Sequence, residues 1–176
     1  MGRNSRVHIV GLGLDHRDLP ERISMPIERA EVLVGGERLL RAFPDHPADK
    51  IPIKGSLDQV MKRVLQEMLA GREVVVLADG DPGFFGIGRR LTKVLGRERV
   101  RIHPNVTVLQ SAAARMAIPW EDIRTVSLHG RRDLGPLLQA LGRSDRIGVF
   151  TDGNCHPGTI AEALFKRHGD VFRMHV

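Results

Sequence analysis

Two carboxylates, three glycines and a proline follow one apolar stretch directly, in the segment Asp79 to Gly86. The residues before it, 73–78, are typical of a buried strand, and residues 87–95 are typical of a helix. Glycine lets a backbone approach a ligand and adopt positive φ, and proline fixes the chain direction. Because ligands of open α/β sheets bind beyond the carboxyl ends of strands, this turn is the first candidate site. A tight turn with solvated aspartates would show the same local pattern.

Four other predicted strands also end in polar or small residues, at segments 11–16, 104–115, 127–132 and 151–158. In the first of them, Gly11 and Gly13 are spaced as in a dinucleotide-binding turn, but His16 stands where the third glycine is expected. The next predicted strand along the chain, residues 31–34, ends in Gly35-Gly36 and not in the carboxylate that would hold a ribose hydroxyl. A nicotinamide-dependent oxidoreductase is therefore a weak alternative.

The other three strand ends allow several kinds of chemistry. Small residues start a helix after Pro104, so its free amides could face a ligand, or its alanines could simply allow close packing. His129 and Arg131 could meet carboxylates of an acidic substrate, or lie in a solvated loop. Cys155 and His156 form a possible nucleophilic pair, but the spacing places no orienting residue beside them. The histidines are dispersed, so the sequence predicts no metal site.

Strand and helix patterns alternate along the whole chain, which predicts an α/β fold. We expect a mostly parallel sheet with helices on both faces in residues 1–117, and a second, smaller α/β domain in residues 118–176. A capping-box pattern at Ser56 should begin a long helix that ends at Gly71. The chain stops on a final expected strand, 171–175, so we expect the C-terminus to be truncated.

Composition limits the class of protein. The chain has 176 residues, a formal charge of +6 and a single cysteine, which suits a reducing cytoplasm. No apolar run is long enough for a membrane span, and the basic residues 1–6 precede a stretch too short for a signal peptide. The basic residues are scattered, tyrosine is absent and there is one tryptophan, so a nucleic-acid partner is not expected. A substrate with many carboxylates fits this charge.

Taken together, these segments resemble the tetrapyrrole methylases, S-adenosylmethionine-dependent enzymes that methylate corrin and sirohaem precursors. The resemblance covers nearly the whole chain in order, and it is carried by the segments 10–13, 30–40, 79–86, 104–107, 119–120 and 127–131. The segments around Gly35-Gly36 and Ser127-Leu128-His129 resemble most specifically the members that methylate C5 of precorrin-6. The chain departs from the family pattern at Leu14 and Asp15 in the first loop and at Asn105, where a glycine is usual.

The resemblance implies two α/β domains with S-adenosylmethionine in the cleft between them, usually in a homodimer. Carried over residue by residue, the cofactor contacts are Leu14, Asp79, Gly80, Asp81, Phe84, Thr107 and Val108, with Thr151 or Asp152 from the second domain. His129 and Arg131 are the candidate substrate contacts. A separate C15-methylating decarboxylase is a possible partner.

The predicted reaction moves a methyl group from the sulfonium of S-adenosylmethionine to a carbon of the corrin precursor. The donor is already activated, so the protein mainly has to position donor and acceptor. This agrees with the lack of a convincing catalytic dyad in the sequence. Four alternatives remain open: a methylase of another tetrapyrrole, a methylase of RNA, a truncated cofactor-binding partner without activity, and the nicotinamide-dependent oxidoreductase.

Overall fold

The computed structural model describes residues 6–17 and 19–176, so the basic N-terminal residues 1–5 and Asp18 lie outside the described part. The chain forms two compact units, one up to Ala112 and one from Ala113 to Val176. The boundary between them falls inside a helix, a few residues before the boundary that the sequence predicts. No helix of the described residues is both long and apolar enough to cross a membrane.

The first unit is built on a sheet of five strands, all of them parallel, in the order β3-β2-β4-β1-β5. Its strands are β1 (Val7–Gly11), β2 (Val32–Gly35), β3 (Asp49–Pro52), β4 (Val74–Ala78) and β5 (Val100–His103). Its helices are α1 (Glu21–Glu28), α2 (Glu37–Leu40), α3 (Leu57–Leu69), α4 (Gly88–Leu95) and the short 3₁₀ helix η1 (Arg97–Arg99). Helix α5 (Val108–Arg115) begins in the first unit and ends in the second. The expected parallel sheet is confirmed.

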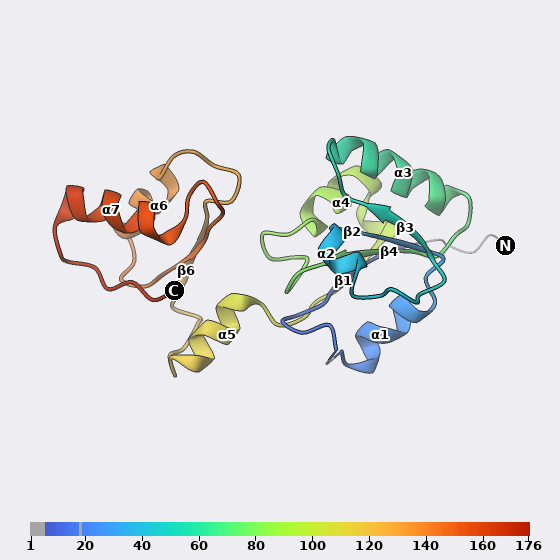
Figure 1. The fold of residues 1–176 in the computed structure, drawn as a ribbon, viewed down its shortest axis with the longest axis horizontal. Coiled ribbons are helices and arrows are strands. Elements are labelled where there is room, and N and C mark those ends of the chain that lie inside the picture. Colours follow the sequence, from blue (N-terminus) through green and yellow to red (C-terminus); the bar gives the residue numbers. More distant parts are fainter. Residues whose placement is uncertain (1–5, 18) are drawn as a thin grey trace. The chain divides into compact units, whose positions relative to one another are not determined.

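Alternating strand residues form two cores, one on each face of this sheet. Figure 1 shows α3 and α1 on opposite sides of the sheet. On one face, Ile9 and Val76 pack with residues of α3 and α4 such as Val64 and Leu91. On the other, Val10 and Leu77 pack with residues of α1 and α2. Successive strand side chains point to opposite faces, so a sheet covered on both sides needs nearly continuous apolar strands.

The second unit is smaller, as expected. Strands β6 (Arg124–Ser127) and β7 (Ile147–Phe150) pair in parallel, and α6 (Gly135–Leu141) and α7 (Pro157–His168) pack with them. The core of this unit contains Leu128, Leu137, Ile160 and the sulfur of Cys155.

Two local predictions were wrong, and one helix was not predicted. The final strand at 171–175 does not form: these residues have no regular structure and pair with no strand among the described residues. Helix α1 was missed, because Pro26 inside it disguises the helical pattern. At the start of α3, the Ser56 side chain makes no capping hydrogen bond. The capping box occurs instead at α5, where Thr107 and Gln110 each bond the backbone amide of the other.

A histidine pair bridges two strands on the face of the sheet that α1 covers. Nδ1 of His8 lies 2.9 Å from Nε2 of His103, and the rings are stacked. Burial lowers the pKa of both rings, with the cation of Arg101 adding to the effect on each. Arg6 also lowers the pKa of His8. Arg22 has two opposing effects on the pKa of His103, because its hydrogen bond raises that pKa and its charge lowers it. The fold therefore favours the pair with at least one ring neutral.

This pair should make the first unit sensitive to acid. A histidine whose pKa is lowered by folding binds protons more readily when unfolded, so stability is lost as pH falls from about 6.5 through the folded-state pKa. We expect His8→Gln, which retains a hydrogen-bonding side chain, to lose less thermal stability than the parent chain between about pH 7.5 and 5.5. Thermal unfolding at the two pH values measures this. The exposed His175→Gln is the control, and an equal loss in His8→Gln and the parent would contradict the prediction.

Candidate functional site

The strand order places a topological switch point between β1 and β4. These strands are neighbours, yet the chain leaves β1 toward β2 on one side and leaves β4 toward β5 on the other. In open α/β sheets, ligands bind beyond the carboxyl ends of strands at such a point. The loops that begin at Leu12 and Asp79 are therefore brought together by topology, although 67 positions of sequence separate them.

Backbone contacts between glycines hold these two loops together. The amide of Leu12 donates to the carbonyl of Ala78 at 2.9 Å, and the amide of Gly80 donates to Gly13 at 3.2 Å. A β-carbon on Gly11 would lie 2.1 Å from the Gly80 oxygen, and one on Gly13 would press on the Asn105 side chain. Gly13 and Gly80 also have positive φ, which favours glycine. Gly11 is thus required by close packing, and Gly13 and Gly80 are favoured by their backbone conformation.

The loop after β5 joins this junction through Asn105 and Thr107. The Asn105 amide nitrogen donates to the carbonyl of Gly11 at 3.1 Å, and its oxygen accepts from Val106. Thr107 is buried beneath Gly80 and caps α5 together with Gln110. The departure from the family pattern at Asn105 therefore has a structural role, since its side chain ties the first loop to the third.

The predicted residues of the first unit gather around this junction but differ in what they can offer a ligand. Leu14 and Val108 are more than half exposed, and Phe84 packs edge-to-face with Phe85. The Asp81 carboxylate accepts from the amide of Gly83 at 2.8 Å, so it shapes its own turn. Asp79 is exposed and forms an ion pair with Arg38 of α2.

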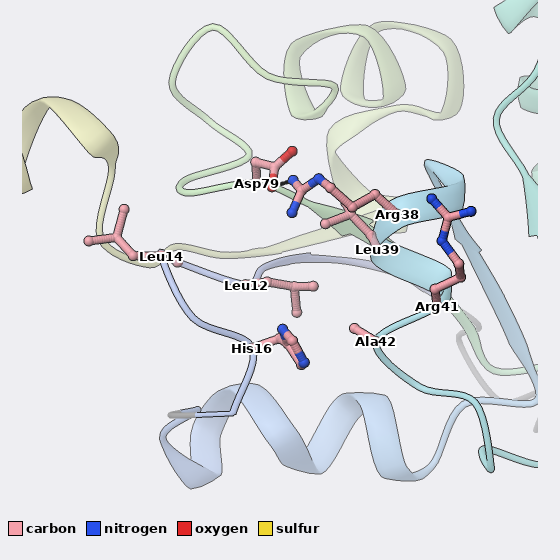
Figure 2. A pocket seen from close by; sticks show the side chains of 9 residues that line it. Leu12, Leu14, His16, Arg38, Leu39, Arg41, Ala42 and Asp79 are labelled. Atoms are coloured by element: carbon pink, nitrogen blue, oxygen red, sulfur yellow. Dashed lines mark hydrogen bonds and ion pairs between the residues drawn. The ribbon is translucent and has the colours of Figure 1, made fainter. Parts of the chain in front are cut away.

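A pocket of about 280 Å³ opens beside the junction (Figure 2). It is lined by Leu12, Gly13, Leu14, His16, Arg38, Leu39, Arg41, Ala42 and Asp79. In Figure 2 the Arg38 guanidinium reaches toward Asp79, and His16 lies below Leu12 near Ala42. Sequence reasoning placed Leu14 and Asp79 at the site but missed His16, Arg38 and Arg41 as lining residues. The signal was available in the Gly35-Gly36-Glu37-Arg38 segment at the end of β2.

The four predicted residues of the second unit lie at the carboxyl ends of its two strands. One oxygen of Asp152 accepts from the amide of Gly130, and the other accepts from Asn154 and Cys155. These three bonds, together with the nearby His129, hold the pKa of Asp152 below its usual range. The carboxylate thus ties the loop after β7 to the loop of His129 and Arg131. The cofactor roles of Thr151 and Asp152 and the substrate roles of His129 and Arg131 stay predictions.

The Cys155-His156 pair is not arranged as a nucleophile and base. Cys155 is buried, and its thiol donates to the carbonyl of Arg131 at 3.4 Å. The His156 ring caps the start of α7, where Nδ1 accepts from Thr159. Among the described residues, no three histidine, cysteine or acidic side chains gather as metal ligands.

Replacing Gly11 with alanine should destabilise the first unit strongly. The added carbon would overlap a backbone oxygen, which cannot rotate away, so we expect a loss of about 3 kcal/mol or more. Gly36→Ala is the matched control, because a β-carbon there meets nothing within 4 Å. Denaturant unfolding compares the two, and equal stabilities would show that the two loops do not pack as described.

Replacing Asp152 with asparagine should destabilise the second unit at neutral pH. An amide nitrogen in place of one oxygen would face a backbone N–H, so at least one bond is lost. Because the pKa is lowered on folding, the carboxylate stabilises this unit above its unfolded pKa and loses that effect as pH falls through the folded one. Thermal unfolding of Asp152→Asn and of the exposed control Asp145→Asn measures this difference. An unchanged melting temperature in Asp152→Asn would contradict the stabilising role of the Asp152 carboxylate between these two loops.

Comparison with known proteins places these features in a family. The family model of the tetrapyrrole (corrin/porphyrin) methylases matches residues 6–176. A cobalt-precorrin-7 C(5)-methyltransferase of Salmonella typhimurium is 32% identical over 160 residues, covering 90% of this chain and 77% of that protein. A decarboxylating precorrin-6Y C(5,15)-methyltransferase of Sinorhizobium sp is 29% identical over 162 residues, covering 89% of this chain but 38% of that protein.

A solved structure agrees with this assignment. The uroporphyrin-III C-methyltransferase of Thermus thermophilus, complexed with S-adenyl homocysteine, is 25% identical, and the superposition has a TM-score of 0.62. It covers 82% of this chain and 68% of that one. The resemblance seen in the sequence is confirmed, and the chain belongs to the tetrapyrrole methylase family.

Proposed function

We propose that the chain is an S-adenosylmethionine-dependent methyltransferase that methylates C5 of a corrin precursor in cobalamin biosynthesis. The observation that carries this proposal is the similarity to a cobalt-precorrin-7 C(5)-methyltransferase, which extends over 90% of this chain and most of that enzyme. The C(5,15) enzyme matches over about two-fifths of its length. A separate C15-methylating decarboxylase is proposed as a partner.

The geometry of the first unit supports a cofactor role for the junction. Three loops meet through backbone contacts of Gly11, Gly13 and Gly80, which allows a ligand to lie close to the main chain. Beside them, the α5 capping box uses the amides of Thr107 and Gln110, whereas the amides of Val108 and Leu109 have no acceptor among the described residues. Open amides of this kind suit polar groups of a bound S-adenosylmethionine.

This cofactor would supply the methyl group on a positively charged sulfonium. The protein's part is to hold the acceptor carbon in line with it and to exclude water. Asp81 is proposed to shape the turn through its bond to Gly83, and Leu14, Phe84 and Val108 to provide apolar contacts. Thr151 and Asp152 are proposed to contact the cofactor, and His129 and Arg131 to contact the substrate. A homodimer and a cytoplasmic location belong to the same proposal.

Calorimetric titration with S-adenosylhomocysteine, with NADH as the control ligand, tests the cofactor assignment. We expect saturable one-site binding of S-adenosylhomocysteine and no binding of NADH. Methyl transfer to cobalt-precorrin-7, followed by mass spectrometry, then tests the acceptor. Binding of NADH alone by the folded chain would favour an oxidoreductase and overturn the proposal. Cofactor binding without methylation of this acceptor would limit the proposal to another tetrapyrrole.

A further inference from the structure

We propose that Arg38 is the residue that anchors a peripheral carboxylate of the acceptor, and that Asp79 occupies its guanidinium until the acceptor arrives. This inference rests on the proposed function and adds a specificity-determining residue to it. It starts from the pocket beside the junction, whose lining includes Arg38, His16, Arg41 and a single carboxylate, Asp79.

The pocket is basic because the acidic groups near it are already neutralised. Asp15 lies next to the lining residues Leu14 and His16. It accepts three hydrogen bonds from the Arg17 side chain and one from the Arg17 backbone amide, and these bonds lower the pKa of the Asp15 carboxyl. Glu37 on α2 is paired with Lys54, which lowers the pKa of Glu37. Among the described residues of the lining, Asp79 is thus the one carboxylate left to face Arg38.

The Arg38–Asp79 pair is suited to exchange. It joins α2 to the loop after β4, and the side chains of Arg38 and Asp79 are 71% and 67% exposed. An exposed ion pair contributes little to stability, so separating it costs little. Asp79 accepts one bond from Arg38, whereas an incoming carboxylate can bind a guanidinium in a bidentate fashion. Figure 2 shows the guanidinium directed at Asp79 across the pocket rim, whereas the Arg41 guanidinium lies apart from this pair.

The apolar part of the pocket provides the second half of the recognition. Leu12 and Leu39 are buried behind the rim, and Ala42 lies near His16 at its far side. An apolar floor with a guanidinium at the rim fits the edge of a flat macrocycle that carries carboxylate side chains. A volume of about 280 Å³ accommodates such an edge and not the whole ring.

If the acceptor carboxylate replaces Asp79 on Arg38, substitutions of these two residues should change macrocycle binding in opposite directions. Arg38→Gln removes the anchor and should weaken macrocycle binding about tenfold, as expected for bonds between charged groups. Asp79→Asn removes the internal competitor and should strengthen binding several-fold. A pair with a merely structural role predicts changes in the same direction. Arg90→Gln and Asp58→Asn are the matched controls, because this pair is similarly exposed and joins α4 to α3.

The probe is a water-soluble porphyrin with only carboxylates on its periphery, titrated into the full chain by fluorescence, with its amide derivative as ligand control. Opposite shifts in Arg38→Gln and Asp79→Asn, with unchanged controls, support the proposal. Three outcomes would overturn the role of Arg38 as an anchor while leaving the methylase assignment intact. They are affinity shifts in the same direction for both variants, equal binding of the amide derivative, and no porphyrin binding by a chain that binds S-adenosylhomocysteine. A folded chain that binds neither ligand would overturn both.

Discussion

The site depends on one steric constraint, the contact of the loop after β1 with the loop after β4 through glycine backbone. Gly11 has no room for a side chain against the Gly80 carbonyl, and Gly13 and Gly80 have positive φ. Two backbone hydrogen bonds then fix the loops to each other. Asn105 and Thr107 fasten the third loop to this pair. The arrangement creates a surface of main chain, where a ligand meets amides and carbonyls before it meets side chains.

Charge is distributed so that this main-chain surface borders a basic pocket. Nearby carboxylates are bound by their own neighbours, Asp15 by Arg17 and Glu37 by Lys54. In the second unit, Asp152 is bound by three backbone amides and serves to join two loops. Apart from Asp79, which pairs with the exposed Arg38 of α2, the acidic residues at the strand ends therefore mainly shape loops. This division suits an anionic acceptor.

Much of the fold follows from local patterns. Nearly continuous apolar strands such as β4 identify a sheet covered on both faces, and the helical spacing of α3 marks one of its covers. Local patterns fail where a tertiary partner decides. Residues 171–175 have strand composition but pair with no strand in the part of the chain that the structure describes. Ser56 has the capping sequence without the capping bond. Thr107, which does cap its helix, has the equivalent pattern with Gln110.

The sequence by itself determined the alternation of strands and helices, the family, and the segments that end each strand, because these are encoded by residue type and spacing within a few positions. Only the tertiary structure decided which strand ends meet. The parallel order places β1 beside β4, so Gly11 and Gly80 become neighbours, and α2 brings Arg38 to Asp79. Such contacts depend on the pairing of distant strands and on the space between backbones, and neither leaves a local pattern in the chain.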